Sequence, residues 1–317
     1  MLQYQVHGWV GHRDGNPTEL SLGKGICPMN SFTFPETKER HDGHYDSERS
    51  QWWDASFLYG QTKHDVNEIR SFAGGKLKVN SENPNLLATR PDGTYFVGDN
   101  KNSWIGISLL QNLFLNEHNL ICDKLAEKYP KMCDDELFGY TRNIIAAMNA
   151  KIHTIDWTVE LLKTNMLELG MKTNWIGLTK SIFGENAPGT PFQIIKKTRA
   201  KNHDIPFCLT EEFAAVYRLH PLCPPGIVLD DSEFISFDNL LGADGRDTLR
   251  RSDNPVAKIM YSMYAYPCGH LVGSNYPDAL RDVKPSDEIG NNLTGIGRRI
   301  DLAAIDLYRD RERGIPL

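Results

Sequence analysis

Two long segments whose apolar residues recur at helical spacing constrain this chain more than any other feature. They cover residues 106–128 and about 134–163, and both follow the 3.6-residue period of an amphipathic helix. The second begins at Asp134-Asp135-Glu136, and acids suit the positive end of a helix dipole. Shorter helices are expected from Thr210, a good N-cap, to His220 before Pro221, and over Asp301–Arg309.

Long stretches rich in Gly, Pro, Asn and Asp separate these helices, at 11–50, 73–103, 184–206 and 221–295. Only short strands, such as Lys76–Val79 and Tyr95–Val97, are predicted there. Loops of this length are usually functional or disordered, so a cofactor or metal that organises them is expected. The sequence predicts a mainly α-helical fold with long loops and few short strands, forming one domain over 1–317.

Composition excludes several classes of protein. Lys and Arg total 35 and Asp and Glu 41, a net charge of −6, which argues against a nucleic-acid binder. No apolar run reaches the roughly 18–20 residues of a membrane span, and no signal peptide is visible. Six cysteines without a C-x-x-C pair disfavour disulfides or zinc and favour a reducing compartment. We expect an intracellular protein; peripheral contact with lipid and the oligomeric state stay open.

The segment 212–224 is the first that suggests chemistry. It reads Glu-Phe-x-x-x-Tyr-x-x-His-Pro-Leu-x-Pro, and on a helix Tyr217 and His220 would share one face. A histidine at a helix end can reach a ligand with a ring nitrogen. In an arbitrary helix, however, a core tyrosine beside a partly exposed histidine is the commoner explanation.

This segment resembles the proximal haem helix of the peroxidase–cyclooxygenase superfamily, and most closely that of the fatty acid α-dioxygenases. Further stretches match in the same order along the chain, and the run at 151–162 favours α-dioxygenases over peroxidases in general. These stretches lie at 3–12, 52–60, 116–119, 151–162, 209–213 and 301–313. The resemblance covers nearly all of this chain but only the central part of a family member, so the catalytic domain over 1–317 is expected to be incomplete.

The resemblance implies an oxidoreductase that uses haem b. His220 would be the proximal iron ligand, His7 the distal histidine, and Gln3 its neighbour one helical turn earlier. Tyr217 would become a phenoxyl radical that abstracts hydrogen from the α-carbon of a long-chain fatty acid. Addition of O2 would then give a 2-hydroperoxy fatty acid, in lipid and oxylipin metabolism.

The resemblance also implies the residues that support substrate and ligand. His153 and Thr158 match the carboxylate anchors, although a spacing of five places them about 140° apart on an ideal helix. The alternative is a core-facing His153 bonded to Asp156. A third anchor, an arginine, would lie downstream of Leu317. Asp306 matches the position that supports the proximal histidine, the alternative being an exposed acid on a mixed-charge helix.

A calcium site is implied by the same resemblance. The oxygen donors would be the Ser50 and Ser56 hydroxyls, the Trp52 carbonyl and the Asp54 carboxylate, all suited to Ca²⁺. The family places an aspartate directly after the distal histidine, and here that position is Gly8. The expected calcium site is therefore weakened.

Two other functions stay open at this stage. A haem peroxidase of the same superfamily would use His7 to cleave hydrogen peroxide, but Lys101 in place of the family's arginine disfavours it. A truncated, non-catalytic haem-binding remnant is the other.

Overall fold

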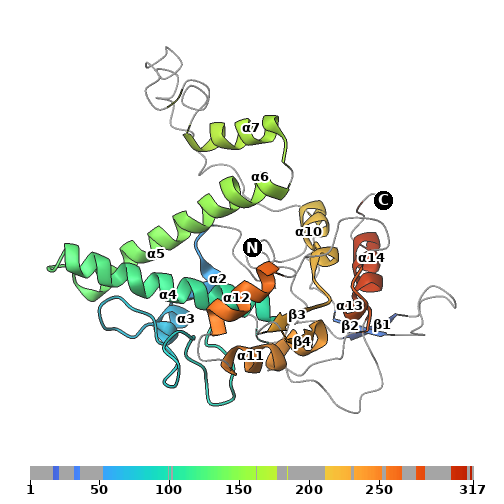
Figure 1. Cartoon of the computed structure of the whole chain (residues 1–317), viewed down its shortest axis with the longest axis horizontal. Helices are drawn as coiled ribbons and strands as arrows, with labels where there is room; N and C mark the ends of the chain where they lie inside the picture. The colour runs from blue at the N-terminus through green and yellow to red at the C-terminus, as the bar shows by residue number, and fades with distance from the viewer. Residues whose placement is uncertain are drawn as a thin grey trace.

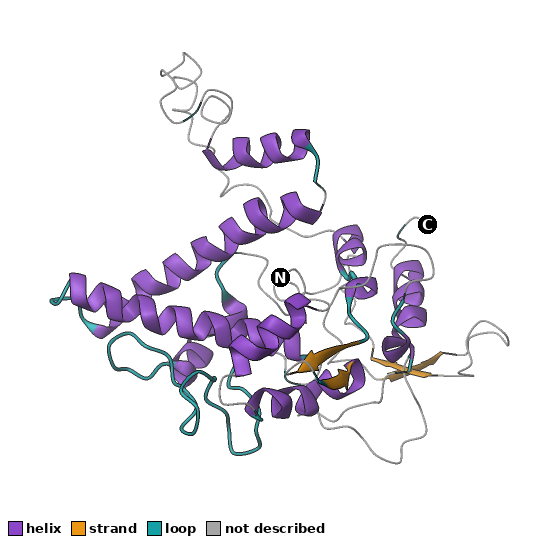
Figure 2. Ribbon diagram, in the orientation of Figure 1, coloured by secondary structure: helices purple, strands orange, loops and turns teal. Residues whose placement is uncertain are grey.

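The fold is mainly helical (Figure 2), as the sequence predicts. The computed structural model describes residues 17–20, 32–35, 53–98, 100, 103–161, 163–176, 184, 211–229, 232–251, 255–265, 276–282, 301–312 and 315. The elements, labelled in Figure 1, are β1 (Pro17–Leu20), β2 (Phe32–Pro35), α2 (Ser56–Tyr59), α3 (Lys63–Ile69), α4 (Ile105–Lys128), α5 (Asp134–Lys151), the π-helix η1 (Ile152–Trp157), α6 (Thr158–Leu161), α7 (Asn165–Ile176), α10 (Glu211–Tyr217), the 3₁₀ turn η3 (His220–Leu222), β3 (Gly226–Leu229), β4 (Glu233–Ser236), the 3₁₀ turn η4 (Phe237–Leu240), α11 (Gly242–Arg250), α12 (Pro255–Ala265), α13 (Asp278–Arg281) and α14 (Leu302–Glu312).

The two long predicted helices are confirmed as α4 and α5, which pack against each other (Figure 1). The start of α5 is fixed by a capping box, because the Glu136 carboxylate accepts the Cys133 N–H at 2.9 Å. The predicted second helix continues past Lys151 to Leu161, but as the π-helical turn η1 and the short α6. That change in helix type is not visible in the apolar periodicity.

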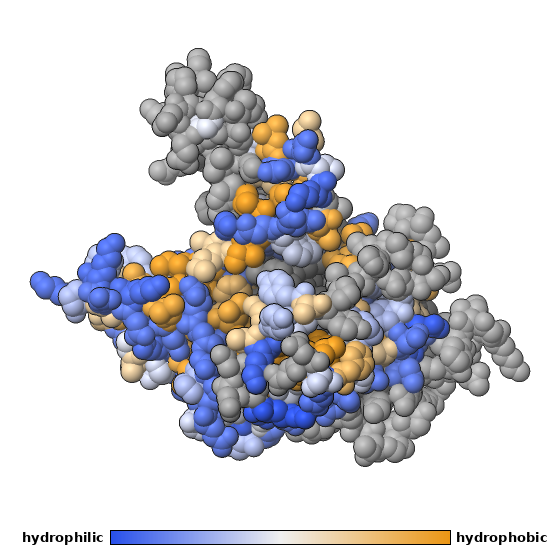
Figure 3. All heavy atoms as spheres, viewed as in Figure 1, coloured by the Kyte–Doolittle hydropathy of each residue, from blue (hydrophilic) through white to orange (hydrophobic). Residues whose placement is uncertain are grey.

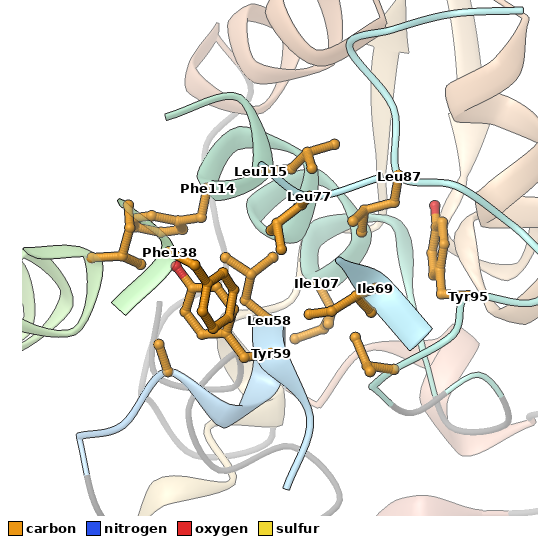
Figure 4. Close-up of a cluster of buried hydrophobic side chains, with 13 residues drawn as sticks. Leu58, Tyr59, Ile69, Leu77, Leu87, Tyr95, Ile107, Phe114, Leu115 and Phe138 are labelled. Atoms are coloured by element: carbon orange, nitrogen blue, oxygen red, sulfur yellow. The ribbon is translucent and has the colours of Figure 1, made fainter. Parts of the chain in front are cut away.

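The helix α4 is buried on two sides and separates two hydrophobic clusters. Ile107, Phe114 and Leu115 face a cluster built with α2, α5 and the loop before α4 (Figure 4). Ile105 and Leu109 face a second cluster formed with β3, η4, α11 and α12. The buried apolar area on both sides holds the long loops against one central helix.

A buried polar network lies at the junction of α2, α4 and α5. His118 is 0% exposed, with Nδ1 2.7 Å from the Tyr59 hydroxyl and Nε2 2.9 Å from the Gly75 carbonyl. Since a carbonyl only accepts, Nε2–H donates to Gly75 and Nδ1 accepts from Tyr59. Burial lowers the pKa of His118 to about 4. Gly75 has φ +72° and lies against the α5 backbone, where a Cβ would meet the Phe138 nitrogen at 2.6 Å.

The strands differ from those predicted. Segments 76–79 and 95–97 form only isolated bridges, such as Arg70 with Leu77 and Thr89 with Tyr95, so the prediction of strands there was wrong. The described strands form two antiparallel pairs, β1 with β2 and β3 with β4, with Pro17 opposite Pro35 and Gly226 opposite Ser236.

The stretch 221–295 was predicted as a loop, and this was wrong over much of its length. It contains β3, β4, α11, α12 and α13. The apolar runs at 227–229 and 234–235 flank Asp230-Asp231-Ser232, a hairpin signal that the composition of the whole stretch hides.

The C-terminal predicted helix is confirmed as α14, which runs to Glu312. It begins after Asp301, whose carboxylate accepts the N–H groups of Ala303 and Ala304 at 2.9 and 3.1 Å. Helix α10, by contrast, ends at Tyr217, three residues before the predicted end. Two residues of turn therefore separate Tyr217 from His220.

The visible surface is mixed in polarity (Figure 3), and apolar side chains interrupt the hydrophilic surface around α5–α7. Met166 on α7 is 76% exposed. Within the described ranges, none of the helices combines the length and the apolar character that crossing a membrane requires.

Candidate functional site

His220 lies just beyond α10, at the start of η3. Leu219 between them has φ +46° and ψ +29°, a left-handed conformation that non-glycine residues rarely adopt. The left-handed conformation of Leu219 turns the chain after α10. The direction of the His220 side chain is therefore set by η3 and not by α10. The expectation that Tyr217 and His220 share one face of a helix was therefore wrong.

The His220 ring is held by α14. Its Nδ1 lies 2.7 Å from the Asp306 carboxylate, and the side chains of the two residues are only 23% and 18% exposed. Nδ1 therefore carries the proton and donates it to Asp306. Within the described part of the chain no hydrogen bond reaches Nε2, which leaves this nitrogen available to a metal. The donor set fits a haem-iron ligand whose other nitrogen is oriented by a carboxylate.

Tyr276 completes this cluster and was missed by sequence reasoning. Its hydroxyl lies 2.8 Å from His220 Nδ1 and donates to Asp306 at 3.1 Å. Burial, followed by the Asp306 charge, raises the pKa of Tyr276 far above its ordinary value, so the phenol keeps its proton. No motif flags this tyrosine, which precedes α13 and lies 56 residues from His220.

Arg218 binds the same helix. Its guanidinium lies 2.7 Å from the Asp310 carboxylate and 3.5 Å from Asp306 Oδ1, with 12% of the side chain exposed. The acids at 306 and 310 are one helical turn apart on α14, so a single arginine reaches both. The chain around His220 is thus joined to α14 by an ion pair of Arg218 with Asp310 and by the hydrogen bond of His220 to Asp306.

Tyr217 is the last residue of α10 and is half-buried. Its ring stacks on Phe213 with centroids 4.1 Å apart and an interplanar angle of 23°. None of the described contacts of Tyr217 is a hydrogen bond to its hydroxyl, and none joins it to His220.

His153 and Thr158 are brought together by the π-helix η1. A π-helix bonds residue i to i+5, and the backbone N–H of Thr158 donates to the His153 carbonyl. The Thr158 hydroxyl donates to the same carbonyl at 2.7 Å. The 140° separation of an ideal α-helix therefore does not apply here. The alternative partner of His153 is also absent, because Asp156 binds Lys151 at 2.8 Å.

The His153 ring lies between two tryptophans. Trp157 stacks on it at 5.2 Å and 18°, and Trp53 lies at 4.9 Å and 51°. Its Nε2 is buried and has no hydrogen-bond partner. Burial lowers the pKa of His153, which favours the neutral ring. A buried polar nitrogen without a partner is rare in folded proteins, and here it suits a polar ligand.

The expected calcium loop is described only in part. The Asp54 carboxylate accepts the Ser56 N–H at 3.0 Å, directly before α2. Ser50, Trp52 and Gly8 lie outside the described residues, as do Gln3, His7 and Lys101. Among the described residues no cluster of three His, Cys, Asp or Glu side chains could hold a metal ion.

The family of the chain follows from a comparison with known proteins. Residues 26–317 match the family model described as animal haem peroxidase. The chain therefore belongs to the animal haem peroxidase family.

Within this family the chain is similar to fatty acid α-dioxygenases. It is 39% identical to alpha-dioxygenase PIOX of Pisum sativum, over 99% of this chain and 52% of that protein. The crystal structure of the Arabidopsis thaliana fatty acid alpha-dioxygenase superposes with a TM-score of 0.82 at 37% identity, covering 99% of this chain and 52% of that one. A tyrosine-to-phenylalanine variant of the Oryza sativa enzyme with palmitic acid has the same TM-score at 34% identity, covering 99% and 55%. The chain spans about half the length of these relatives.

Proposed function

We propose that this chain carries the haem-binding and radical-forming part of a fatty acid α-dioxygenase. The buried, unpartnered Nε2 of His153, beside Thr158 on the π-helical turn, is the observation that supports this over a peroxidase. A peroxidase has no need of a carboxylate site there. The similarity to plant α-dioxygenases and to a relative crystallised with palmitic acid supports the same substrate class.

The proposed cofactor is haem b, with His220 Nε2 as the proximal ligand. When bound, haem would supply the oxidising power that converts Tyr217 to a phenoxyl radical. Asp306 holds the His220 ring through Nδ1, and the left-handed Leu219 sets the direction in which the ring points. His7 and Gln3 are proposed for the distal side on resemblance alone.

The proposed substrate site binds the carboxylate of a long-chain fatty acid. His153 would donate through Nε2, and Thr158 would turn its hydroxyl from the His153 carbonyl to a carboxylate oxygen. A carboxylate close to the ring would also raise the pKa of His153 and favour its charged form, which strengthens the hydrogen bond. Anchoring the carboxylate fixes the α-carbon, which is its direct neighbour, relative to the Tyr217 oxygen.

In the proposed reaction Tyr217 begins and ends each cycle as a phenoxyl radical. Its phenoxyl oxygen takes a hydrogen atom from the α-carbon, which leaves a carbon radical and restores the phenol. O2 adds to this carbon to give a peroxyl radical. The peroxyl radical takes the hydrogen atom back from Tyr217, so that a 2-hydroperoxy fatty acid forms and the phenoxyl radical returns.

We propose that the loop before α2 binds Ca²⁺ weakly. Asp54 is its one described carboxylate donor, and Ser56 would add a hydroxyl. Gly8 in place of an aspartate removes a second charge, so we expect weaker binding than in a site with two carboxylates.

The decisive experiment reconstitutes the 317-residue chain with haem and measures O2 uptake with palmitate. We expect a Soret band, O2 uptake, and a 2-hydroperoxide that decays to an aldehyde one carbon shorter. Tyr217→Phe should keep the Soret band and abolish uptake, whereas the control Tyr264→Phe, at a residue 84% exposed on α12, should change neither.

The other outcomes separate the alternatives. Uptake that survives Tyr217→Phe contradicts the proposed radical site. Peroxide-dependent oxidation of a phenol without O2 uptake would favour a peroxidase. A missing Soret band would favour a non-catalytic remnant.

A further inference from the structure

We infer that Tyr276 is a positioning residue for the proximal histidine, which sets how strongly Asp306 withdraws the His220 proton. The inference rests on the proposed ligation of haem by His220. It concerns a residue that no motif in the chain identifies.

The geometry places three polar groups in mutual contact. The His220 Nδ1 to Asp306 Oδ2 distance is 2.7 Å, the Tyr276 hydroxyl lies 2.8 Å from Nδ1, and it lies 3.1 Å from Oδ2. The Tyr276 and His220 rings meet edge to face, with centroids 5.8 Å apart at 70°. The hydroxyl therefore faces both members of the pair.

Tyr276 is held in place by the short helix that follows it. α13 packs against α14, the helix that carries Asp306, and Leu280 of α13 is 4% exposed. Tyr276 itself packs against the second hydrophobic cluster. The phenol thus approaches the His220–Asp306 pair from a third segment, besides η3, which carries His220, and α14, which carries Asp306.

The assignment of protons follows from the groups present. A carboxylate only accepts, so both the Tyr276 O–H and the His220 Nδ1–H point at Asp306 Oδ2. The Arg218 Nε lies 3.5 Å from Oδ1 of the same carboxylate. The negative charge of Asp306 is thus shared among at least three donors of the described residues, and the imidazole receives only part of it.

Sharing weakens the hydrogen bond from His220. A carboxylate acting on an imidazole alone draws its N–H strongly, gives the ring more anionic character and makes it a stronger iron ligand. Each further donor to that carboxylate reduces this effect. Tyr276 therefore moderates the anionic character that the hydrogen bond to Asp306 gives the His220 ring.

The test uses the haem-reconstituted chain and reads the iron–histidine bond, which a merely structural role would not tune in two directions. In Tyr276→Phe we expect the ferrous iron–histidine Raman band to move to higher frequency and the Fe(III)/Fe(II) potential to fall. In Asp306→Asn both should move the opposite way. Tyr261→Phe, at a residue 65% exposed on α12, is the control and should match the parent chain.

A second variant tests the inference even if Tyr276→Phe fails to fold. A fluorinated tyrosine at 276 is a stronger donor of the same shape, and it should shift both readouts in the direction of Asp306→Asn. Unchanged values in Tyr276→Phe, or shifts in the same direction as Asp306→Asn, would overturn the inference.

Failure of the proposed haem function can be distinguished from failure of the inference about Tyr276. If the parent chain shows no Soret band, the proposed haem function fails. The NMR shift of the His220 Nδ1 proton in the haem-free chain then decides the inference. It should move downfield in Tyr276→Phe, and an unmoved or upfield resonance would contradict the role of Tyr276.

Discussion

His118, which is fully buried, and His153, which is half-buried, differ in how their ring nitrogens are bonded. Both have a lowered pKa because burial disfavours the charged ring. Both ring nitrogens of His118 are bonded, to Tyr59 and Gly75, whereas Nε2 of His153 has no partner. A fully bonded buried histidine stabilises the fold in which it sits, while an unbonded one leaves a donor for a ligand. Hydrogen bonding therefore distinguishes the two histidines more clearly than burial does, and it supports the proposed role of His153 in binding a ligand.

Replacing His118 should have the largest effect on stability. His118→Leu leaves the Tyr59 hydroxyl buried without its partner and leaves the Gly75 carbonyl with only the weak Cys122 thiol donor, and an unsatisfied buried group costs about 1–3 kcal/mol. We expect the free energy of unfolding to fall by roughly 3 kcal/mol in a urea titration. His153→Leu removes no hydrogen bond of its ring and should change it by less than about 1 kcal/mol. Equal losses of unfolding free energy in the two variants would show that His118 and His153 do not differ in their contribution to stability.

The pH dependence of stability should come from the same residue. An unfolded histidine titrates near 6.5, and the pKa of folded His118 is about 4. Because the unfolded chain binds the proton first as the pH falls, this stabilisation is complete above pH 6.5 and is lost as the pH falls towards 4. The loss should approach about 3 kcal/mol.

The two histidines can be separated in this titration. His153 also has a lowered pKa and contributes to the same pH window, so the measurement is repeated in His153→Gln. The slope that remains belongs to His118. Asp65, whose pKa lies below 3.8, acts only at lower pH. A flat profile between pH 6.5 and 4 would contradict the burial of a neutral His118.

Replacing His153 should affect binding and leave the fold intact. A donor to a charged partner contributes about 1.5–3 kcal/mol, so His153→Gln should weaken palmitate binding by about 10- to 100-fold in calorimetry. His64→Gln, at an exposed histidine of α3, is the matched control. Unchanged affinity in His153→Gln would show that the free nitrogen serves no carboxylate.

The smallest effect is expected from the tryptophan that borders this ring. Trp53→Leu removes the ring at 4.9 Å from His153, an aromatic contact that contributes about 0.5–1.5 kcal/mol. Palmitate affinity should fall by roughly 2- to 10-fold, less than in His153→Gln. Tyr140→Leu, at an exposed position of α5, is the control. A larger loss in Trp53→Leu than in His153→Gln would reverse the roles assigned to the two side chains.

Periodicity predicted the helices that are long and half-buried. α4, α5 and α14 follow from their apolar spacing, and the start of α5 also follows from its acidic first turn. The π-helical turn at 152–157 and the left-handed Leu219 did not follow, because both are local departures from the 3.6-residue period that tertiary contacts stabilise. Apart from the loop predicted over 221–295 and the strands predicted at 76–79 and 95–97, the predictions failed where the backbone is unusual, and residues of the candidate site lie at these places.

The side chains of the site were predictable only where a motif contains them. The resemblance named His220 with Asp306 and His153 with Thr158. The structure places the Asp306 carboxylate on His220 Nδ1 and the Thr158 hydroxyl on the main-chain carbonyl of His153, and the roles of these residues stay predictions. Tyr276 belongs to no motif and reaches His220 only through the packing of α13 on α14. Such a contact between distant segments leaves no mark in local sequence spacing.

The π-helical turn has a consequence at the level of the gene. From Asp134 to Leu161 the helix is continuous, and its first half packs in the core while its end carries His153 and Thr158. A turn that bonds i to i+5 contains one residue more than the α-helical turn it replaces, which corresponds to a single codon. Deleting that codon would restore the α-helical phase and rotate everything downstream by about 100°. Thr158 and everything after it would then face another direction relative to the core half of the helix, so the proposed substrate site depends on the length of this segment as well as on its composition.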